Sequence, residues 1–448
     1  MDGRRPRDGP ENASREERRR VSQRPEDGTV FRNARLSSGG ALHDLFVEGG
    51  KFRSVAPARP AETGRSGRGP ARAARPEEVD LGGRAVLPGF IESHIHIDKA
   101  FLEERRPNLS GTLQDAIAIT LELKRRVTKR DIHERSGRAL RLLLRHGATR
   151  ARAQAEVDPI VGLQGMEAAL ELREAWRGRV DLQIVVFPQE GIEQQPGTED
   201  LMREALRMGG DAVGGVPYND LDPERHLDIV FRLAGEFGKD VDLHLDFTDD
   251  PEDRRIESVA RRTLALGLQG RVAVGHLTSL GAMDEGVAAR IVSLIAEAGI
   301  HVLPLPATDL FLCGRGPVPP RHRSLTRVKD LLRAGINVSI ASNNIRNAFT
   351  PSGRGDLLEI GLLLASVAHM SGASDRVLIP PMFTHNAARV LGISDRYGIA
   401  PGRDADFVVL DTENFDDILI DQPEKRYVVK AGRVLVENLR ETRWGEGG

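Results

Sequence analysis

The sequence has one cysteine, Cys313, among 448 residues. A single thiol cannot form an intramolecular disulfide, and it cannot supply the sulfur ligands of a cysteine-based zinc site. The chain also lacks the run of about 18 apolar residues that a membrane-spanning helix needs. Its charged N-terminus has no apolar core of the kind found in secretory signals. These absences favour a reducing compartment, and we expect a cytoplasmic protein without a membrane partner.

An excess of one charge sign is also missing. Lysine and arginine number 64 and aspartate and glutamate number 66, which gives a formal net charge of -2. No long-range field therefore favours nucleic acid as a partner. Apolar residues make up 40% of the chain and charged residues 29%, as is typical of globular proteins. The length accommodates a large barrel together with a small second domain.

Residues 1–28 contain almost no apolar side chains and many arginines. Such a segment cannot bury a core, so we expect a disordered Arg-rich tail. The tail could touch an acidic partner, although a solvated tail or an over-extended start site is the simpler explanation of its composition.

Strand-like alternation occupies both ends of the remaining chain, and between them β-rich runs alternate with amphipathic helical segments. This alternation predicts an α/β fold, a (β/α)8 TIM barrel over residues 86–396. The strands in 29–85 and 397–448 predict one small composite β-sandwich domain built from both chain ends. The eight predicted barrel strands lie near residues 85–91, 148–157, 180–188, 211–216, 240–246, 271–276, 300–304 and 336–341.

Four histidines occur at the ends of predicted strands. His94 and His96 are two residues apart, and side chains at i and i+2 of a strand point to the same face. Both imidazoles therefore aim at one point, as two ligands of one divalent ion would. Barrel active sites form at the C-terminal strand ends, where His244 and His276 are also expected. Either of these two, taken alone, would more simply be a core or surface histidine.

The segments that carry these histidines resemble the amidohydrolase superfamily, and more narrowly its cytosine deaminases and N-isopropylammelide amidohydrolases. The resemblance implies that His94, His96 and His244 bind one divalent metal ion, zinc or iron. It implies that His276 polarises the substrate or orients the attacking water. It further implies that Gln189 hydrogen-bonds the amide-like edge of the substrate, although a structural hydrogen bond is an equal alternative. The similarity starts near residue 29 and includes segments 88–99, 182–191, 242–246, 270–276, 335–338 and 397–406.

Two regions depart from the resembled enzymes. Cytosine deaminases have a glutamate three residues after the fifth-strand histidine, where this chain has Phe247. The triazine enzymes have a histidine two residues after that ligand, where this chain has Asp246. The family aspartate that follows the eighth strand, a metal ligand and general base, is replaced by Asn343. An amide oxygen can bind a metal but cannot accept a catalytic proton, so we expect Asp246 to carry the proton.

Further candidates follow the seventh and eighth strands and the histidine pair. Asp309 and Arg315 lie in a loop that walls the substrate in the resembled enzymes, and Asn344 follows Asn343. We name Asp309, Arg315 and Asn344 as substrate-binding candidates, with structural ion pairs as the alternative for the two charged residues. Asp98 and Lys99 could support the metal ligands from behind, or they could lie on the surface.

The sequence therefore predicts an enzyme, a metal-dependent hydrolase that cleaves a C–N bond of a small nitrogen heterocycle or cyclic amide by means of a metal-activated water. Asn343 and Phe247 motivate an alternative, an impaired homologue that binds a metal or ligand as a sensor or scaffold. A metal-free phosphate-binding barrel is disfavoured, because no glycine-rich phosphate loop precedes a helix. We expect a small heterocyclic substrate and a homo-oligomer.

Overall fold

The computed structural model describes residues 28–58, 77–315 and 324–445. Within these ranges, no helix is both long enough and apolar enough to cross a membrane. The Arg-rich tail expected over residues 1–28 lies outside them, apart from its last residue.

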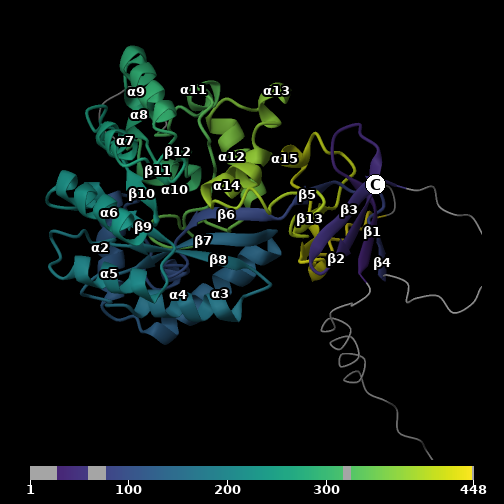
Figure 1. The fold of residues 1–448 in the computed structure, drawn as a ribbon, viewed down its shortest axis with the longest axis horizontal. Coiled ribbons are helices and arrows are strands. Elements are labelled where there is room, and N and C mark those ends of the chain that lie inside the picture. The colour runs from purple at the N-terminus through teal and green to yellow at the C-terminus, as the bar shows by residue number, and fades with distance from the viewer. Residues whose placement is uncertain (1–27, 59–76, 316–323, 446–448) are drawn as a thin grey trace, which may run out of the picture.

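Two four-stranded sheets lie together at one end of the molecule (Figure 1). The first sheet has the order β3-β2-β1-β4 and the second has the order β15-β14-β13-β5. The sheets share an apolar core, in which the rings of Phe31 and Phe407 meet edge to face with centroids 4.8 Å apart. Segments from the two ends of the chain thus complete one core. The strands are β1 (Thr29–Arg35), β2 (Leu42–Glu48), β3 (Lys51–Pro57), β4 (Glu77–Asp80), β5 (Val86–Pro88), β13 (Phe407–Leu410), β14 (Lys425–Lys430) and β15 (Arg433–Glu437).

Seven parallel strands follow one another in chain order around a barrel. An eighth segment closes the ring without a regular ladder, because Val338 pairs with Val302 and Asn343 pairs with Ile95. The prediction of an α/β TIM barrel with a small β-sandwich domain is confirmed. The barrel strands are β6 (Phe90–Ile95), β7 (Ala148–Glu156), β8 (Asp181–Phe187), β9 (Ala212–Gly215), β10 (Asp240–Leu245), β11 (Val272–His276) and β12 (His301–Leu303).

The predicted first barrel strand, 85–91, is two strands that belong to different sheets. β5 pairs antiparallel with β13 of the small domain, whereas β6 starts at Phe90 and pairs with β7 of the barrel. Gly89 separates them, and a Cβ at this position would collide with the side chain of Thr149. The chain therefore passes from one domain to the other at a residue that has to be glycine.

Helices cover the outside of the barrel, and α6 (Pro223–Phe237) illustrates how local chemistry sets their ends. The side chain of Asp222 accepts two backbone N–H groups of the first turn, and Pro223 needs no hydrogen bond there. Gly238 ends the helix with a φ of 64°, a conformation that glycine adopts without strain. The other helices are η1 (Leu102–Glu104), α2 (Leu113–Lys124), α3 (Lys129–Arg145), α4 (Gln164–Ala175), α5 (Thr198–Met208), η2 (Pro217–Asn219), α7 (Arg255–Ala265), α8 (Ser279–Ala282), α9 (Glu285–Glu297), α10 (Pro306–Leu312), α11 (Val328–Arg333), α12 (Leu357–Val367), α13 (Ala373–Arg376), η3 (Pro380–Phe383), α14 (His385–Val390) and α15 (Ile418–Asp421).

Helix α2 lies at the end of the barrel farthest from the small domain (Figure 1). Its apolar side chains form one cluster with Phe247 and Phe349, from loops that follow barrel strands, and with Leu312, the last residue of α10. Thr112 caps the helix by accepting the N–H of Asp115. An apolar layer therefore covers the mouth of the barrel, and side chains of α2 form part of this layer.

Candidate functional site

Three histidines from opposite sides of the barrel meet beneath this layer. His94 lies on β6, His96 directly follows the last residue of that strand, and His244 lies on β10. The Nε2 atom of His244 is 3.1 Å from that of His94 and 2.8 Å from that of His96. The three side chains are at most 4% exposed. The i, i+2 spacing at the end of β6 and the position of His244 near the end of its own strand bring these rings to one point.

The donor set fits a divalent metal ion. The Nδ1 atom of His94 is 3.1 Å from a carboxylate oxygen of Asp242, so the proton of this ring belongs on Nδ1 and Nε2 presents a lone pair. One hydrogen on the Nε2 of His244 could serve only one of its two nitrogen contacts. Burial and nearby positive charge hold the pKa of His96 and of His244 well below the usual value. Neutral imidazoles with facing lone pairs are the form that binds zinc or iron.

The backbone of Asn343 is hydrogen-bonded to two residues of this cluster. It bridges to β6, donating to the carbonyl of His94 and accepting the N–H of His96, and its φ of 60° is unusual for a residue other than glycine. The side-chain Nδ2 donates to Thr308 at 3.1 Å, whereas the buried Oδ1 has no hydrogen-bond partner among the described residues. An unpartnered buried oxygen fits a neutral metal ligand, the role expected for Asn343.

His276 ends β11 next to the histidine cluster. Its ring centroid is 5.4 Å from that of His244, and Phe247 stacks on it at 3.9 Å. The Nδ1 atom lies 2.6 Å from a carboxylate oxygen of Asp309, whose other oxygen accepts the N–H of Leu305. Both oxygens of Asp309 therefore already have hydrogen-bond partners. This geometry favours a role in orienting the ring of His276 over the direct substrate contact expected from the sequence.

Asp246 does not sit where the strand period predicted. β10 ends at Leu245, and Asp246 has a φ of 49°, so the backbone turns before the side chain can alternate back toward His244. Its two carboxylate oxygens accept the N–H groups of Arg255 and Ile256 at the start of α7. Burial, followed by the neighbouring Asp253, raises the pKa of Asp246 well above its usual value. A carboxyl group held at a helix N-terminus is poorly placed as the proton carrier.

Gln189 lies just beyond β8 and is held from both sides. Its Oε1 accepts a hydrogen bond from the Lys99 ammonium at 2.6 Å, and its backbone carbonyl accepts one from Asn219. The aromatic ring that ends the same strand, Phe187, packs against His244 with centroids 4.4 Å apart. The strand that precedes Gln189 therefore reaches the histidines, and one end of the Gln189 amide is already hydrogen-bonded.

Two other substrate-binding candidates are engaged elsewhere. The guanidinium of Arg315 donates to the carbonyl of Phe311 and lies over its ring, so it braces the end of α10 and its own loop. The side-chain oxygen of Asn344 accepts from Asn347 at 2.6 Å. Both residues shape the loops around the mouth, and their side chains do not reach the histidine cluster through any contact within the described ranges.

Several residues that organise the site were not singled out from the sequence. Asp242 precedes His244 by two positions, so the same strand period that aligned His94 with His96 could have identified it. Arg152, on β7, donates to the second oxygen of Asp242 at 3.3 Å. Glu156, at the end of β7, forms ion pairs with Lys99 and Lys124. The ion pairs of Arg152 and Glu156 could not be predicted from the sequence, because their partners lie on other elements that only the folded barrel brings close.

Comparisons with known proteins agree with this site and fold. The model of the amidohydrolase family matches residues 77–134 and 119–436. N-isopropylammelide isopropyl amidohydrolase of Pseudomonas sp. (strain ADP) is 30% identical over 416 residues, which cover 91% of this chain and 97% of that protein. Pterin deaminase of Rhizobium rhizogenes is 30% identical over 403 residues, or 89% of each chain.

Among solved structures, 5-methylcytosine deaminase from Klebsiella pneumoniae, liganded with 5-fluorocytosine, has a TM-score of 0.87 to this structure at 30% identity. The match covers 94% of this chain and 100% of that one. The resemblance drawn from the sequence is thereby confirmed, as is the expected class of enzyme, and the chain belongs to the amidohydrolase family.

Proposed function

We propose that the protein hydrolyses a C–N bond of a small nitrogen heterocycle or cyclic amide with the help of one divalent metal ion, zinc or iron. The observation that carries this proposal is the convergence of three Nε2 atoms, from His94, His96 and His244, beside the hydrogen-bonded pair His276 and Asp309. Asn343 would add a neutral oxygen to the metal ligands. A single ion matches the single cluster of ligand atoms among the described residues.

The relatives support this chemistry. Two are an isopropyl amidohydrolase and a pterin deaminase, and a structural neighbour is a 5-methylcytosine deaminase. Their names describe removal of an amine or ammonia from nitrogen-containing rings. The substrate of this chain is therefore expected to be a small ring of that kind.

When bound, a divalent ion at this point lowers the pKa of a water molecule toward neutrality and so supplies hydroxide. The residues of the chain then have to transfer the proton and hold the substrate ring. Asp309 holds the proton of His276 on Nδ1, which leaves Nε2 of that ring to accept a proton on the cluster side. His276 can then return the proton to the departing nitrogen. Phe247 and the apolar layer above it exclude bulk water from this exchange.

A second candidate function rests on Asn343, because an amide cannot accept the proton that the family aspartate takes. In that case the protein binds a metal or ligand as a sensor or scaffold without turnover. The two functions differ in one measurement, hydrolysis by metal-loaded protein. A cytoplasmic location and a homo-oligomer remain predictions.

The test begins with metal content. Purified protein should contain about one zinc or iron per chain, and a His94→Ala/His96→Ala variant should contain almost none, while His133→Ala on the outer helix α3 serves as the control. Metal-loaded protein is then screened for ammonia or amine release over pyrimidines, triazines, pterins and cyclic ureas. Stoichiometric metal in the double variant would refute the metal site. A full screen without turnover would favour the sensor.

A further inference from the structure

Lys99 places a buried positive charge next to the histidine cluster. The residue follows His96 by three positions, and its side chain is about 4% exposed. Its ammonium is 2.6 Å from Oε1 of Gln189 and 2.7 Å from a carboxylate oxygen of Glu156. It also lies over the rings of Phe187 and Phe349, at 5.4 and 5.6 Å from their centroids. Because Phe187 packs on His244, a single aromatic ring separates this charge from the metal ligands.

The contact between Lys99 and Gln189 determines which end of the Gln189 side-chain amide is the oxygen and which is the nitrogen. An ammonium group has only donors, so the atom that faces it at 2.6 Å has to be the carbonyl oxygen. The amide nitrogen therefore points the other way, and it makes no hydrogen bond to any residue in the described part of the chain. Gln189 can thus offer a substrate two N–H donors, while its oxygen is turned toward Lys99, which takes one of its two lone pairs.

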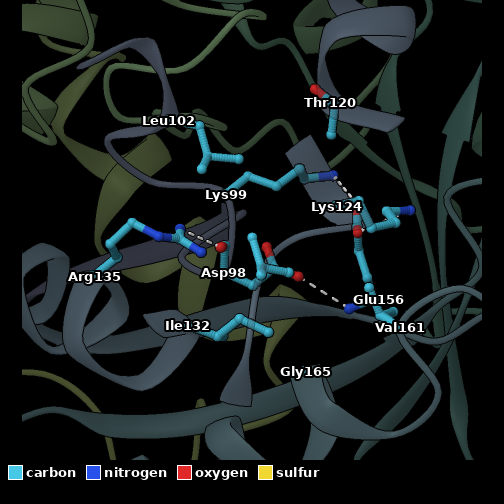
Figure 2. Close-up of a pocket in the computed structure, with 11 residues that line it drawn as sticks. Asp98, Lys99, Leu102, Thr120, Lys124, Ile132, Arg135, Glu156, Val161 and Gly165 are labelled. Atoms are coloured by element: carbon cyan, nitrogen blue, oxygen red, sulfur yellow. Dashed lines mark hydrogen bonds and ion pairs between the residues drawn. The ribbon is translucent and has the colours of Figure 1, made fainter. Parts of the chain in front are cut away.

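Most carboxylates of this region form ion pairs with Lys124 and not with Lys99. Lys124, the last residue of α2, contacts Glu156, Asp158 and Glu190 at 2.7 to 2.9 Å. Among the described residues, Lys99 forms an ion pair only with Glu156, which it shares with Lys124, and Figure 2 shows the two lysine side chains near it. Within the same ranges, the Lys99 ammonium otherwise contacts two aromatic faces and an amide oxygen. Its charge is therefore compensated less completely than that of Lys124.

We propose that Lys99 determines substrate specificity by holding Gln189 in the orientation in which its N–H groups face the substrate. The site then selects rings whose edge toward Gln189 carries only hydrogen-bond acceptors. A ring that is deprotonated at the nitrogen between two carbonyl groups fits this description best. A neutral ring that offers an N–H beside a carbonyl needs a donor and an acceptor in turn, and the oxygen of Gln189 is turned toward Lys99. A deprotonated ring nitrogen flanked by carbonyl oxygens accepts throughout, and its negative charge complements the ammonium. This inference rests on the proposed function, since it concerns the substrate of that same site.

The test compares two rings of similar size by titration calorimetry on the metal-loaded protein at pH 8. Cyanuric acid loses a ring proton near neutral pH and is then an anion with acceptors along one edge. Uracil stays neutral and keeps its ring N–H groups. We expect cyanurate to bind at least about tenfold more tightly, the scale of one charge-assisted hydrogen bond. In Lys99→Met the ratio of the two affinities should fall to near one with the metal content unchanged.

A second variant guards against loss of folding, because Lys99→Met leaves Glu156 with one partner fewer. The double variant Lys99→Met/Glu156→Gln removes both charges and should show the same loss of discrimination. Lys129→Met, on the surface of α3, is the matched control and should keep the preference of the natural protein. Discrimination that survives in the double variant overturns the proposal.

The remaining outcomes separate this inference from the proposed function. Metal-loaded protein that hydrolyses a ring but binds uracil as tightly as cyanurate, or binds no cyanurate at millimolar concentration, overturns the role of Lys99 alone. Protein that holds no metal in its histidine cluster and hydrolyses no ring overturns the proposed function. A tenfold preference that disappears with Lys99 supports the inference.

Discussion

The position of one proton decides what His276 can do. Asp309 is fully buried, and one of its oxygens lies 2.6 Å from Nδ1 of His276. Burial lowers the pKa of His276, while the nearby carboxylate of Asp309 opposes this effect. A ring that is neutral at rest, with its proton held on Nδ1, can accept a proton through Nε2. This arrangement offers the base that Asn343 cannot be.

Replacement of Asp309 by asparagine tests this role. The amide oxygen can still accept the N–H of Leu305, but it no longer stabilises the imidazolium form of His276. We expect the rate of hydrolysis on the best ring of the screen to fall at least about 10²-fold, the lower range for a proton-transfer group. Metal content should stay near one ion per chain. A variant with unchanged rate would show that another group carries the proton.

The identity of residue 247 leads to an expectation for cytosine. Phe247 stacks on His276 at 3.9 Å and belongs to the apolar cluster of the mouth, so it offers cytosine neither a proton nor a hydrogen bond. Cytosine should therefore be a poor substrate, with its kcat/KM at least about 10²-fold below that of the best ring. Steady-state ammonia release from the two rings measures this ratio, and comparable values would contradict it.

The strand period predicted the direction of a side chain correctly where extended backbone continued, and wrongly where the backbone turned. His94 lies on β6 and His96 follows the last residue of that strand, but His96 has no positive φ and its N–H still bonds to Asn343, so the period of two brings both rings to one side. Asp246 lies one residue beyond the end of β10 with a positive φ, and no sequence pattern announced that turn. For Asp309 the sequence left substrate binding and a structural ion pair both open, because its partner, His276, is 33 positions away in the chain and only the barrel brings them together.

At the scale of elements, seven of the eight predicted barrel strands appear as regular strands. The first had to be divided at Gly89, because the close approach of Thr149 shows only in the folded chain. The eighth, near 336–341, contributes Val338 and Asn343 as isolated bridges. This segment leaves regular β geometry where Asn343 takes a φ of 60°, and there its backbone bonds to His94 and His96. Hydrophobic periodicity found the segment but could not reveal this conformation.

Lys124 fixes the end of α2 against the barrel, and its removal should loosen this element. The ammonium contacts three buried carboxylates, those of Glu156, Asp158 and Glu190. In Lys124→Met these charges lose their common partner, so the free energy of unfolding should fall by about 3–5 kcal/mol. Urea denaturation at pH 7 measures the change. Lowering the pH toward 5 should restore part of it, since the carboxylates can then take up protons.

Lys129→Met provides the control for that experiment. Lys129 lies near the start of α3, and its ion pairs with Glu167 and Glu171 are exposed to solvent. Exposed pairs of this kind contribute little to stability, so this variant should unfold close to the natural protein. An equal loss in both variants would mean that the three buried carboxylates do not depend on Lys124.

At the scale of the whole molecule, buried ion pairs join the small domain to the barrel. Arg150 extends from β7, and its guanidinium contacts Asp406, which precedes β13, at 2.8 Å. Lys430, at the end of β14, contacts the same carboxylate at 2.7 Å and also reaches Asp181 at the start of β8. Arg150 and Lys430 are both nearly fully buried. The carboxylate of Asp406 thus stands between a cation of each domain.

Replacement of Asp406 by asparagine should therefore weaken the whole molecule. The amide can still accept the N–H of Ala431, which Asp406 accepts at 2.9 Å, but it leaves Arg150 and Lys430 each with one carboxylate partner fewer. Loss of a partner from a buried ion pair costs about 3–5 kcal/mol, and the remaining contacts with Asp404 and Asp181 place this variant near the lower value. Asp395→Asn, at an exposed position, should unfold like the natural protein.

The pH dependence of that difference gives a sharper test. Burial alone would raise the pKa of Asp406, but Lys430 and Arg150 outweigh it and lower the pKa below the ordinary value of 3.8. A group whose pKa is lower in the folded state contributes stability that is fully present above its unfolded pKa and is lost as the pH falls through its folded pKa. The gap in urea midpoint between the natural protein and Asp406→Asn should therefore stay constant from pH 7 down to about 4 and shrink only below that. A gap that already closes between pH 7 and 5 would mean that Asp406 is not the ionised link between the two domains.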